Sequence, residues 1–450
     1  MISLEAATHP LDFAYVATKR MYWGNEQTTC LQEIATLFGD PSAPVDTSKS
    51  LALLSESRRI MQQDADGLSC HYPFLVTDYE KIGRHDLALE VIDDSTAYAL
   101  GESALDRTIL MINTATACLD IGETDRCLKI IPGMNHLLRF AQELEWYSGA
   151  FPLLLRLGRV RDAVLVAKYM DARSKASAFA EIAFHESIAK EHAEKILAYA
   201  LDLLERSHYV TEDVDIFDWS RVHIAMLHAY KGQFEKALEL VRKLKDQSYS
   251  PNVLSTIASR MLKSGMINDA VRVLTAIQMY HKKRQDIVCL EHVRSPLSRD
   301  FQLRWIPDEK LLPLVPQLCQ AGLDDIAGSF LTDALANVER ILDYTTRLEN
   351  LAKLVRWFVP VDRDVAETLV ERVLAAPLAD LEPKEDNPTI KFSRTAPAIL
   401  FRLAIDIFKH DLSWNEKRQE QFGKHLEPLP VYGKIADRVA CRVHQDSVIF

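Results

Sequence analysis

The stretch Ala229-Tyr-Lys-Gly232-Gln-Phe-Glu-Lys-Ala237-Leu238 has the form of a turn between two helices. Gly232 follows an apolar helical segment, at a place where the chain commonly adopts a positive φ that only glycine takes without a steric penalty from Cβ. Ala237 stands five residues later, and a small side chain there lets two helices approach closely. We therefore expect Gly232 to end one helix and Ala237 to lie where that helix meets the next.

The same turn recurs along the chain at intervals near one or two units of about 37 residues, with one longer interval that contains an insertion. The glycines stand at Gly83, Gly122, Gly158, Gly232, Gly265 and Gly322. The small residues five positions later are Ala88, Cys127, Ala163, Ala237, Ala270 and Ala327. Near the start of each second helix stands an acid or Asn that we expect to accept the free helix N–H groups and to meet the positive end of the helix dipole, namely Asp86, Asp125, Asp162, Glu235, Asn268 and Asp325. Each unit predicts an αα-hairpin that must stack on its neighbours to bury its apolar face.

One of these units resembles a known repeat family. Residues 218–251 carry Ile224, Ala225, Gly232, Phe234 and Ala237 at the spacing of the tetratricopeptide signature. The stretch departs from that signature at Arg221, His228 and Leu244, and a generic divergent α-solenoid is the alternative. The resemblance implies an all-α, right-handed superhelical α-solenoid of about eight helix-turn-helix repeats, counting two degenerate units at 178–204 and 350–374. It also implies a concave surface, lined by the first helix of each hairpin, that holds an extended peptide or a partner helix.

The ends of the chain differ from its middle. We expect an N-terminal helical cap over 1–69, the repeat array over 70–375 with an insertion at about 278–308, a Pro-rich linker over 376–397, and a C-terminal helical cap and tail over 398–450. Solenoids need such caps because a terminal repeat otherwise exposes an apolar face.

Composition excludes several classes of protein. The chain has 450 residues, 48% of them hydrophobic, with 53 Lys+Arg against 64 Asp+Glu for a net charge of −11. That hydrophobic content is too high for a disordered chain, and 15 glycines are too few for a fold built on many tight β-turns. The chain contains no apolar run of about 18 residues, so we expect no membrane span. Its start does not resemble a signal peptide. Its seven cysteines include no CxxC pair, which suits a reducing compartment. We expect a cytoplasmic protein that does not bind a membrane.

A search for catalytic motifs is negative. The chain contains no GxGxxG, GxxxxGK[ST], GxSxG or HExxH sequence, so we expect no enzyme, no cofactor and no metal. Glu181, His185, Glu186 and His192 could supply half of a metal site, but a polar helical face is the favoured interpretation. Cys289 and His292, with His281, form an equally weak pattern. Cys118 and Cys127 fall at packed positions of a hairpin and are interpreted as buried residues.

If the array is tetratricopeptide-like, its first-helix positions give candidate groove residues. These are Trp219, Met226, Tyr230, Ser255, Ser259 and Lys263. Aromatic residues and Met would anchor a partner, and the polar groups would set its register. The leading hypothesis is therefore a non-enzymatic protein-binding scaffold or regulator whose protein or peptide partner the sequence does not identify.

Two charged segments leave alternatives open. The stretch 281–305 has a charge of +3 and contains Lys282, Lys283, Arg284, Arg294, Arg299, Arg304 and Trp305. It could bind an acidic peptide, a phosphate group or nucleic acid. The net charge of −11 argues against extended nucleic-acid contact. A solvent-exposed loop is the simpler interpretation. An acidic stretch before Trp219 could receive a basic peptide or be a solvated loop, and it comprises Asp202, Glu205, Glu212, Asp213, Asp215 and Asp218. A helical-array enzyme without a recognisable motif, using His185 or His292, is the third hypothesis.

Overall fold

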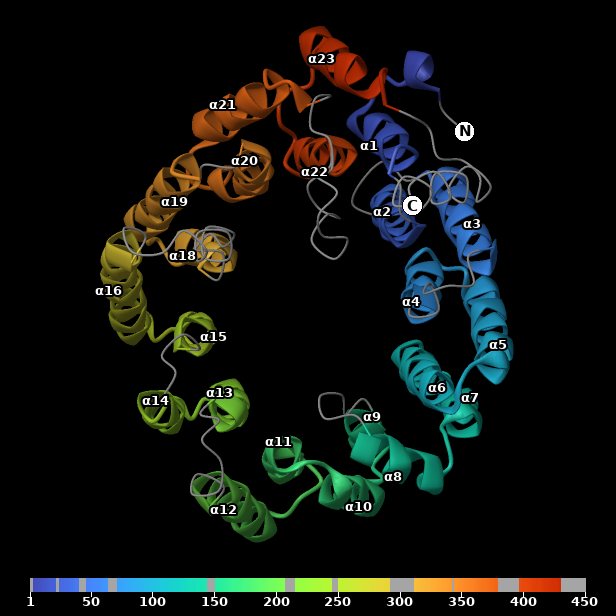
Figure 1. Cartoon of the computed structure of the whole chain (residues 1–450), viewed down its shortest axis with the longest axis vertical. Helices are drawn as coiled ribbons and strands as arrows, with labels where there is room; N and C mark the ends of the chain where they lie inside the picture. Colours follow the sequence, from blue (N-terminus) through green and yellow to red (C-terminus); the bar gives the residue numbers. More distant parts are fainter. Residues whose placement is uncertain are drawn as a thin grey trace, which may run out of the picture. The chain divides into compact units, whose positions relative to one another are not determined.

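The structure is a computed structural model that describes residues 3–21, 24–39, 46–63, 71–143, 150–206, 215–244, 250–291, 311–341, 344–378 and 396–429. All the regular structure in these ranges is helical, which confirms the predicted all-α class (Figure 1). None of the described helices is both long and apolar enough to cross a membrane.

The first half of the chain contains a short 3-10 helix and twelve described α-helices. Their bounds are η1 Leu4–Ala6, α1 Pro10–Thr18, α2 Gly24–Phe38, α3 Thr47–Gln63, α4 Tyr72–Lys81, α5 His85–Gly101, α6 Ala104–Asp120, α7 Thr124–Ile130, α8 Met134–Glu143, α9 Ala150–Arg156, α10 Val160–Tyr169, α11 Ala172–Phe184 and α12 Lys190–Arg206. The described helices of the second half are α13 Asp215–Tyr230, α14 Phe234–Arg242, α15 Ser250–Lys263, α16 Ile267–Glu291, η6 Leu312–Leu314, α18 Val315–Gln320, α19 Asp324–Glu339, α20 Tyr344–Phe358, α21 Arg363–Leu374, α22 Ala396–Lys409 and α23 Glu416–Leu426.

The predicted glycine turns are confirmed at all six places. Each of the six glycines has a φ between 69° and 84° and directly follows the first helix of a hairpin. At Gly232, the glycine N–H donates to the Ala229 carbonyl at 3.1 Å, and the N–H of Gln233 donates to the His228 carbonyl at 2.9 Å. This paired arrangement is a Schellman motif, which satisfies carbonyls left open at a helix end.

The small residues that follow the glycines are all fully buried, as expected for residues between packed helices. Cys118 and Cys127 are buried, as expected, and neither forms a disulfide. Burial raises the pKa of the Cys118 thiol to about 12. The six small side chains therefore lie in the packed interior.

The acids near the start of the second helices act as the sequence predicts at Asp86, whose carboxylate accepts from the Leu87 N–H, but not at α10 and α14. In the described turns before α10 and α14, the N-cap residues are Arg159 and Gln233, and neither caps its helix with a side chain. Asp162 lies in the first turn of α10 and accepts a hydrogen bond from Arg159 Nε at 2.7 Å. At α10 and α14, Asp162 and Glu235 thus meet the helix dipole from within the first turn instead of capping the helix.

Helix packing divides the chain into two compact units. One unit, called the terminal unit here, comprises 1–101, 116–128 and 331–450, and the other, the central unit, comprises 102–115 and 129–330. This grouping differs from the predicted boundaries, because the N-terminal and C-terminal segments belong to the same unit. Residues 379–395 of the predicted linker and the tail beyond 429 lie outside the described residues.

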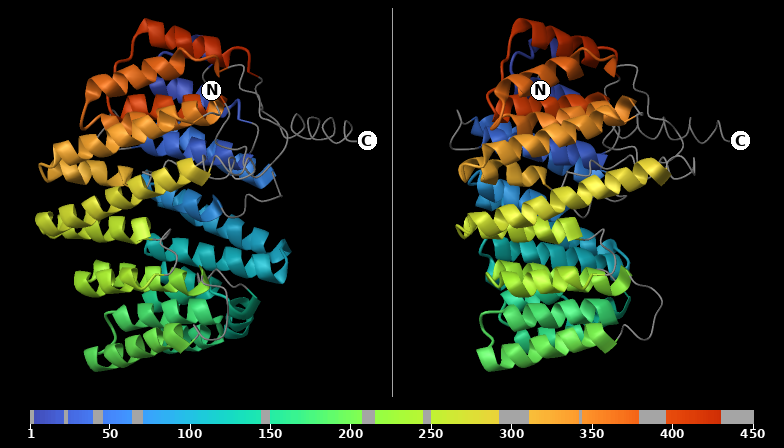
Figure 2. Two further views of the ribbon diagram at one scale, coloured as in Figure 1. Left: turned by 60° about the vertical axis from the view of Figure 1, so that its left-hand side comes forward. Right: turned by 90° about the vertical axis from the view of Figure 1, so that its left-hand side faces the viewer.

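In the central unit, helices pack in pairs. α11 packs on α12, α13 on α14 and α15 on α16, and the first helices of these pairs, α11, α13 and α15, lie side by side (Figure 1). Successive helices of α13 to α16 run nearly parallel or antiparallel to one another (Figure 2, green to yellow). The central unit therefore presents a surface made of consecutive first helices.

In the terminal unit, the two ends of the chain pack on each other. α1 packs on α22, α23 and α2, and α20 packs on α21 and α22. The ring of Phe13 contacts those of Trp414 and Phe422, with centroid distances of 5.4 and 5.7 Å. Trp414 Nε1 donates to the Thr8 carbonyl at 2.8 Å. The segments predicted as separate caps thus cover each other's apolar surface, and we call this contact the chain-end junction.

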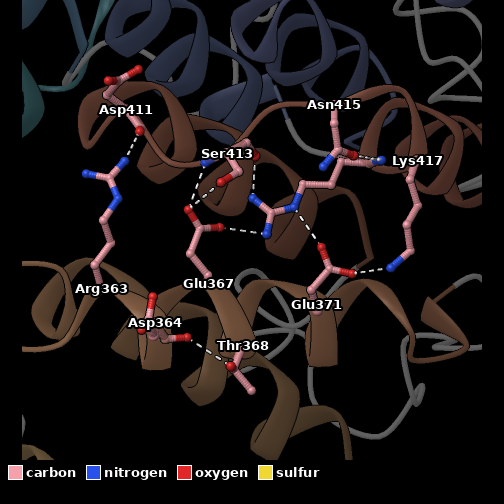
Figure 3. Close-up of polar contacts among 10 residues, drawn as sticks. Arg363, Asp364, Glu367, Thr368, Glu371, Asp411, Ser413, Asn415 and Lys417 are labelled. Atoms are coloured by element: carbon pink, nitrogen blue, oxygen red, sulfur yellow. Dashed lines mark hydrogen bonds and ion pairs between the residues drawn. The ribbon is translucent and has the colours of Figure 1, made fainter.

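A buried arginine, Arg418, joins α21 to α23 beside the junction by binding Glu367 and Glu371, which Figure 3 labels. Arg418 donates to Glu367 Oε2 at 2.7 Å and to Glu371 Oε1 at 2.8 Å, and it also donates to the Ser413 carbonyl. Hydrogen bonds from Lys417 and from Arg418 hold the pKa of Glu371 below its ordinary value. Because Glu367 and Glu371 are one helical turn apart, one guanidinium group can bind both.

Candidate functional site

The candidate site is the face of α13 that carries three of the predicted groove residues. Trp219 and Tyr230 are 42% and 50% exposed, and Met226 between them is half-buried. The spacings of seven and four residues place all three on one side of the helix. The structure therefore brings together the three groove residues predicted on α13.

Trp219 is ordered by contacts that reach α11. Its ring stacks on the His223 ring at a centroid distance of 5.8 Å and an angle of 23°. His223 Nε2 in turn lies 3.0 Å from Glu181 Oε1 on α11. His223 was not among the predicted site residues, although its position four residues after Trp219 was a usable signal.

Tyr230 is ordered by a contact that reaches α15. The guanidinium carbon of Arg260 lies 4.0 Å from the centre of the Tyr230 ring, which is a close cation–π contact. Lys263 is exposed one turn further along α15. Arg260 was not among the predicted site residues, although its neighbour Ser259 was.

The two serines predicted as groove residues on α15 differ from each other in exposure. Ser255 is only 8% exposed, so its hydroxyl is not open to a partner and its assignment to the groove is wrong. Ser259 is half-buried, and its hydroxyl donates to Gln317 Oε1 on α18 at 2.8 Å. Ser255 faces the interior because α15 packs on both α13 and α16.

A buried charge pair lies beneath this face. Asp218 is fully buried and accepts a hydrogen bond from Arg221 Nη1 at 2.9 Å. Asp202, at the other end of the predicted acidic stretch, pairs with Arg206 at 2.8 Å. Asp218 is therefore not available to a basic peptide, and residues 207–214 of that stretch lie outside the described residues.

The buried side of α13 carries a neutral histidine. Burial lowers the pKa of His228, and its Nδ1 lies 2.8 Å from Gln233 Oε1. The His228 ring also packs edge-on against Phe184 of α11 at 5.0 Å. His228 thus packs the first helices α11 and α13 together.

Glu181 and His185, which could have supplied half of a metal site, contact other side chains. Glu181 pairs with His223, while His185 Nδ1 lies 2.7 Å from the Ser187 hydroxyl. Over the described ranges, no group of three or more His, Cys, Asp or Glu side chains is placed to hold a metal ion.

The basic stretch begins within a helix. Lys282, Lys283 and Arg284 lie on the C-terminal part of α16, which continues to Glu291 instead of ending before an insertion at 278. Arg294, Arg299, Arg304 and Trp305 lie outside the described residues. Binding of a phosphate group or nucleic acid by this stretch stays a prediction.

Comparison with known proteins gives no family. No protein-family model matches the chain, and no curated protein matches it. Among solved structures it is similar to a "circular tandem repeat protein with novel repeat topology and enhanced subunit contact surfaces", with 14% sequence identity and a TM-score of 0.25 over 93% of this chain and 86% of that one. The helical-repeat character of the chain therefore rests on its own helices and glycine turns.

Proposed function

We propose that this chain is a non-enzymatic protein-binding scaffold that holds a partner peptide or helix against the α11–α13–α15 face. The observation that carries the proposal is the row of Trp219, Met226 and Tyr230 on α13, with both aromatic rings substantially exposed. Trp and Tyr are enriched among the residues that contribute most to binding at protein interfaces.

The ordering of the two rings supports this proposal. His223 and Arg260 each pack against one of the exposed rings and restrict its rotamers before any partner arrives. A side chain that is already ordered loses less conformational entropy on binding. Trp219 and Tyr230 are eleven residues apart, or about 16 Å along the helix axis, which matches about three turns of a partner helix or five residues of extended peptide.

The same proposal includes a tetratricopeptide-like superhelical arrangement of the hairpins. A right-handed tetratricopeptide-like superhelix would place the first helices α11, α13 and α15 on its concave side. A groove of that kind accommodates peptides through a few anchor residues on successive first helices.

A displayed peptide library selected against the purified full chain provides a probe of this face. We expect enriched peptides to bind the wild-type chain and to lose about tenfold or more in affinity for the Trp219→Ala/Tyr230→Ala double variant. Titration by fluorescence anisotropy of labelled peptides measures the loss.

Tyr169→Ala is the matched control, because Tyr169 on α10 is 46% exposed and lies on a second helix of a hairpin. Full affinity in the control together with a loss in the double variant supports the proposal. If selection enriches no peptide, or if every enriched peptide binds the double variant as tightly as wild type, the α13 face is not the binding surface.

A further inference from the structure

The α11–α13–α15 face carries positive charge at the end that holds Tyr230. The Arg260 guanidinium lies over the Tyr230 ring at 4.0 Å, and Lys263 is exposed on the same helix as Arg260. Lys231 directly follows Tyr230 and is also exposed. None of these three cations forms an ion pair with a described residue. This end of the face therefore holds charge that the described part of the protein does not neutralise.

Arg260 and Lys263 lie on the side of α15 that meets α13. They are three residues apart and so share one face of the helix, and the contact of Arg260 with Tyr230 shows that this face is turned toward α13. Lys263 stands two residues before the turn glycine of its hairpin, as Tyr230 does in the preceding hairpin. A segment that crosses the exposed Tyr230 ring would therefore meet Arg260 and Lys263 next.

The acids of these helices are already engaged with other residues. Among the acids on α11, α13 and α15 whose side chains the structure describes, Glu181 pairs with His223 at 3.0 Å and Asp218 pairs with Arg221 at 2.9 Å. The Glu181 pair adjoins Trp219, through the stacking of His223 on that ring. The face thus has an acid near Trp219 and unpaired cations near Tyr230.

A carboxylate is the chemical complement of the Tyr230 end. The Arg260 side chain is half-buried, and its N–H groups form no hydrogen bond with a described residue. Guanidinium groups bind carboxylates through paired, charge-assisted hydrogen bonds, and partial burial strengthens the attraction. The ring of Tyr230 holds the guanidinium in place, so less side-chain entropy is lost when a carboxylate binds.

We propose that the partner held on this face is an acidic segment of a protein. It would place an apolar side chain against Trp219 and Met226, and carboxylates of Asp or Glu against Arg260 and Lys263. In an extended segment about five residues would separate the apolar anchor from the carboxylates, given the length of α13 between the two aromatic rings. This inference rests on the proposed function, because it uses the same face.

Two parallel selections from a displayed peptide library test the charge of the partner. One uses the full wild-type chain and the other the full-length Arg260→Gln/Lys263→Gln variant. We expect peptides enriched on wild type to contain more Asp and Glu than the unselected library, and peptides enriched on the variant to lack this excess. In fluorescence anisotropy titrations, the peptides from wild type should lose about tenfold or more in affinity for the variant.

Lys168→Gln is the matched control for the loss of positive charge. Lys168 is an exposed lysine on α10, the second helix of its hairpin, and it forms no ion pair with a described residue. We expect the acidic peptides to bind this variant as tightly as wild type. An equal loss in Lys168→Gln would reflect the net charge of the chain and would overturn the assignment to Arg260 and Lys263.

A charge reversal tests the site without changing the packed Arg260. Lys263 is exposed, so Lys263→Glu leaves the packing of α15 intact. We expect the acidic peptides to bind it more weakly than wild type. Copies of these peptides with Lys in place of Asp and Glu should bind it more tightly than they bind wild type. Equal binding of the acidic peptides to wild type and to both charge variants overturns the proposal.

The remaining outcomes separate this inference from the proposed function. Enriched peptides that have no excess of Asp and Glu, yet lose affinity for Trp219→Ala/Tyr230→Ala, would retain the α13 binding surface and overturn the acidic partner. Selection that enriches no peptide on wild type would overturn both. Tighter binding of labelled oligo-dT than of any enriched peptide, lost in Arg260→Gln/Lys263→Gln, would assign the cations to nucleic acid and overturn the acidic partner.

Discussion

The glycine-turn hairpins and the chain-end junction are held together by different kinds of contact. A hairpin depends on a glycine with positive φ and a small residue five positions later, both within one short stretch. The junction depends on residues about 400 positions apart, such as Phe13 and Trp414, and on the buried Arg418 beside them. Local backbone geometry therefore governs the hairpins, while long-range packing and buried charge govern the junction.

The largest expected effect comes from removing the buried arginine beside the junction. Arg418→Ala leaves Glu367 and Glu371 without their shared guanidinium group and opens a cavity at a side chain that is only 3% exposed. We expect the free energy of unfolding of the terminal unit to fall by about 3 kcal/mol. Denaturant unfolding followed by tryptophan fluorescence measures it, since Trp414 lies in the junction.

Lys417→Ala is the matched control for this prediction. Lys417 neighbours Arg418 and also pairs with Glu371, but its side chain is 69% exposed. Its removal should cost about 0.5 kcal/mol or less, because exposed ion pairs contribute little. Similar effects of the two substitutions would contradict the distinction between buried and exposed charge.

A second effect comes from Asp406 on α22, the helix that packs on α1. Burial raises the pKa of Asp406 to about 6, and its Oδ2 has no partner among the described residues. A raised carboxyl pKa stabilises the folded protein at low pH, and this contribution is lost as pH rises through about 6. We expect Asp406→Asn to be more stable than wild type above pH 6, by about 2 kcal/mol.

The pH dependence distinguishes this cause from a general change in packing. The stability difference between Asp406→Asn and wild type should shrink as pH falls from about 6 to about 4, because Asp406 becomes neutral in the folded state. Thermal unfolding at a series of pH values measures this difference. A difference that does not vary with pH would show that Asp406 is not the titrating group.

The smallest effects are expected at the turns. Gly232 has a φ of 71°, and none of the described atoms lies within 4 Å of an added Cβ, so Gly232→Ala tests backbone strain alone. We expect a loss of about 1 kcal/mol in the free energy of unfolding of the central unit. A stability equal to that of wild type, measured by denaturant titration, would show that positive φ is not what selects glycine there.

Asp411 provides the reverse test in the terminal unit. It is the one non-glycine residue in the described ranges with positive φ, at 48°, and it follows α22. Asp411→Gly should relieve strain and raise stability by less than about 1 kcal/mol, because it retains the carbonyl that accepts from Arg363. A loss of stability would mean that the aspartate side chain matters more than the backbone conformation.

The sequence predicts those parts of the fold that are determined over short distances. The six turns were predictable because glycine and a small residue recur at a fixed spacing. Each glycine is required by the positive φ of its own turn, which depends on local sequence alone. The pattern does not predict helix length: α7, Thr124–Ile130, has only seven residues, and Pro132 follows shortly after it. The contact of Phe13 with Trp414 could not be predicted, because no repeated sequence pattern near either residue indicates its distant partner.

The candidate site also contains residues that local sequence predicts and residues that depend on packing between helices. Trp219, Met226 and Tyr230 were predictable because helical spacing alone puts them on one face. Ser255 was misplaced because its burial depends on two neighbouring helices, which repeat register does not reveal. Arg260 was missed because its contact with Tyr230 forms only when α15 packs on α13, whereas the stacking of His223 on Trp219 lies within α13 and could have been predicted from their spacing of four residues.

The packing of α1 has a consequence for synthesis on the ribosome. Every residue of α1 is buried, yet α22 and α23, which cover it, begin only at Ala396 and Glu416. At about 5–20 residues per second, roughly 20–80 s separate the emergence of α1 from that of α22. During that interval α1 lacks the two helices that help to bury it in the folded chain, so we expect its apolar side chains to stay partly exposed until residues 396–426 have been made.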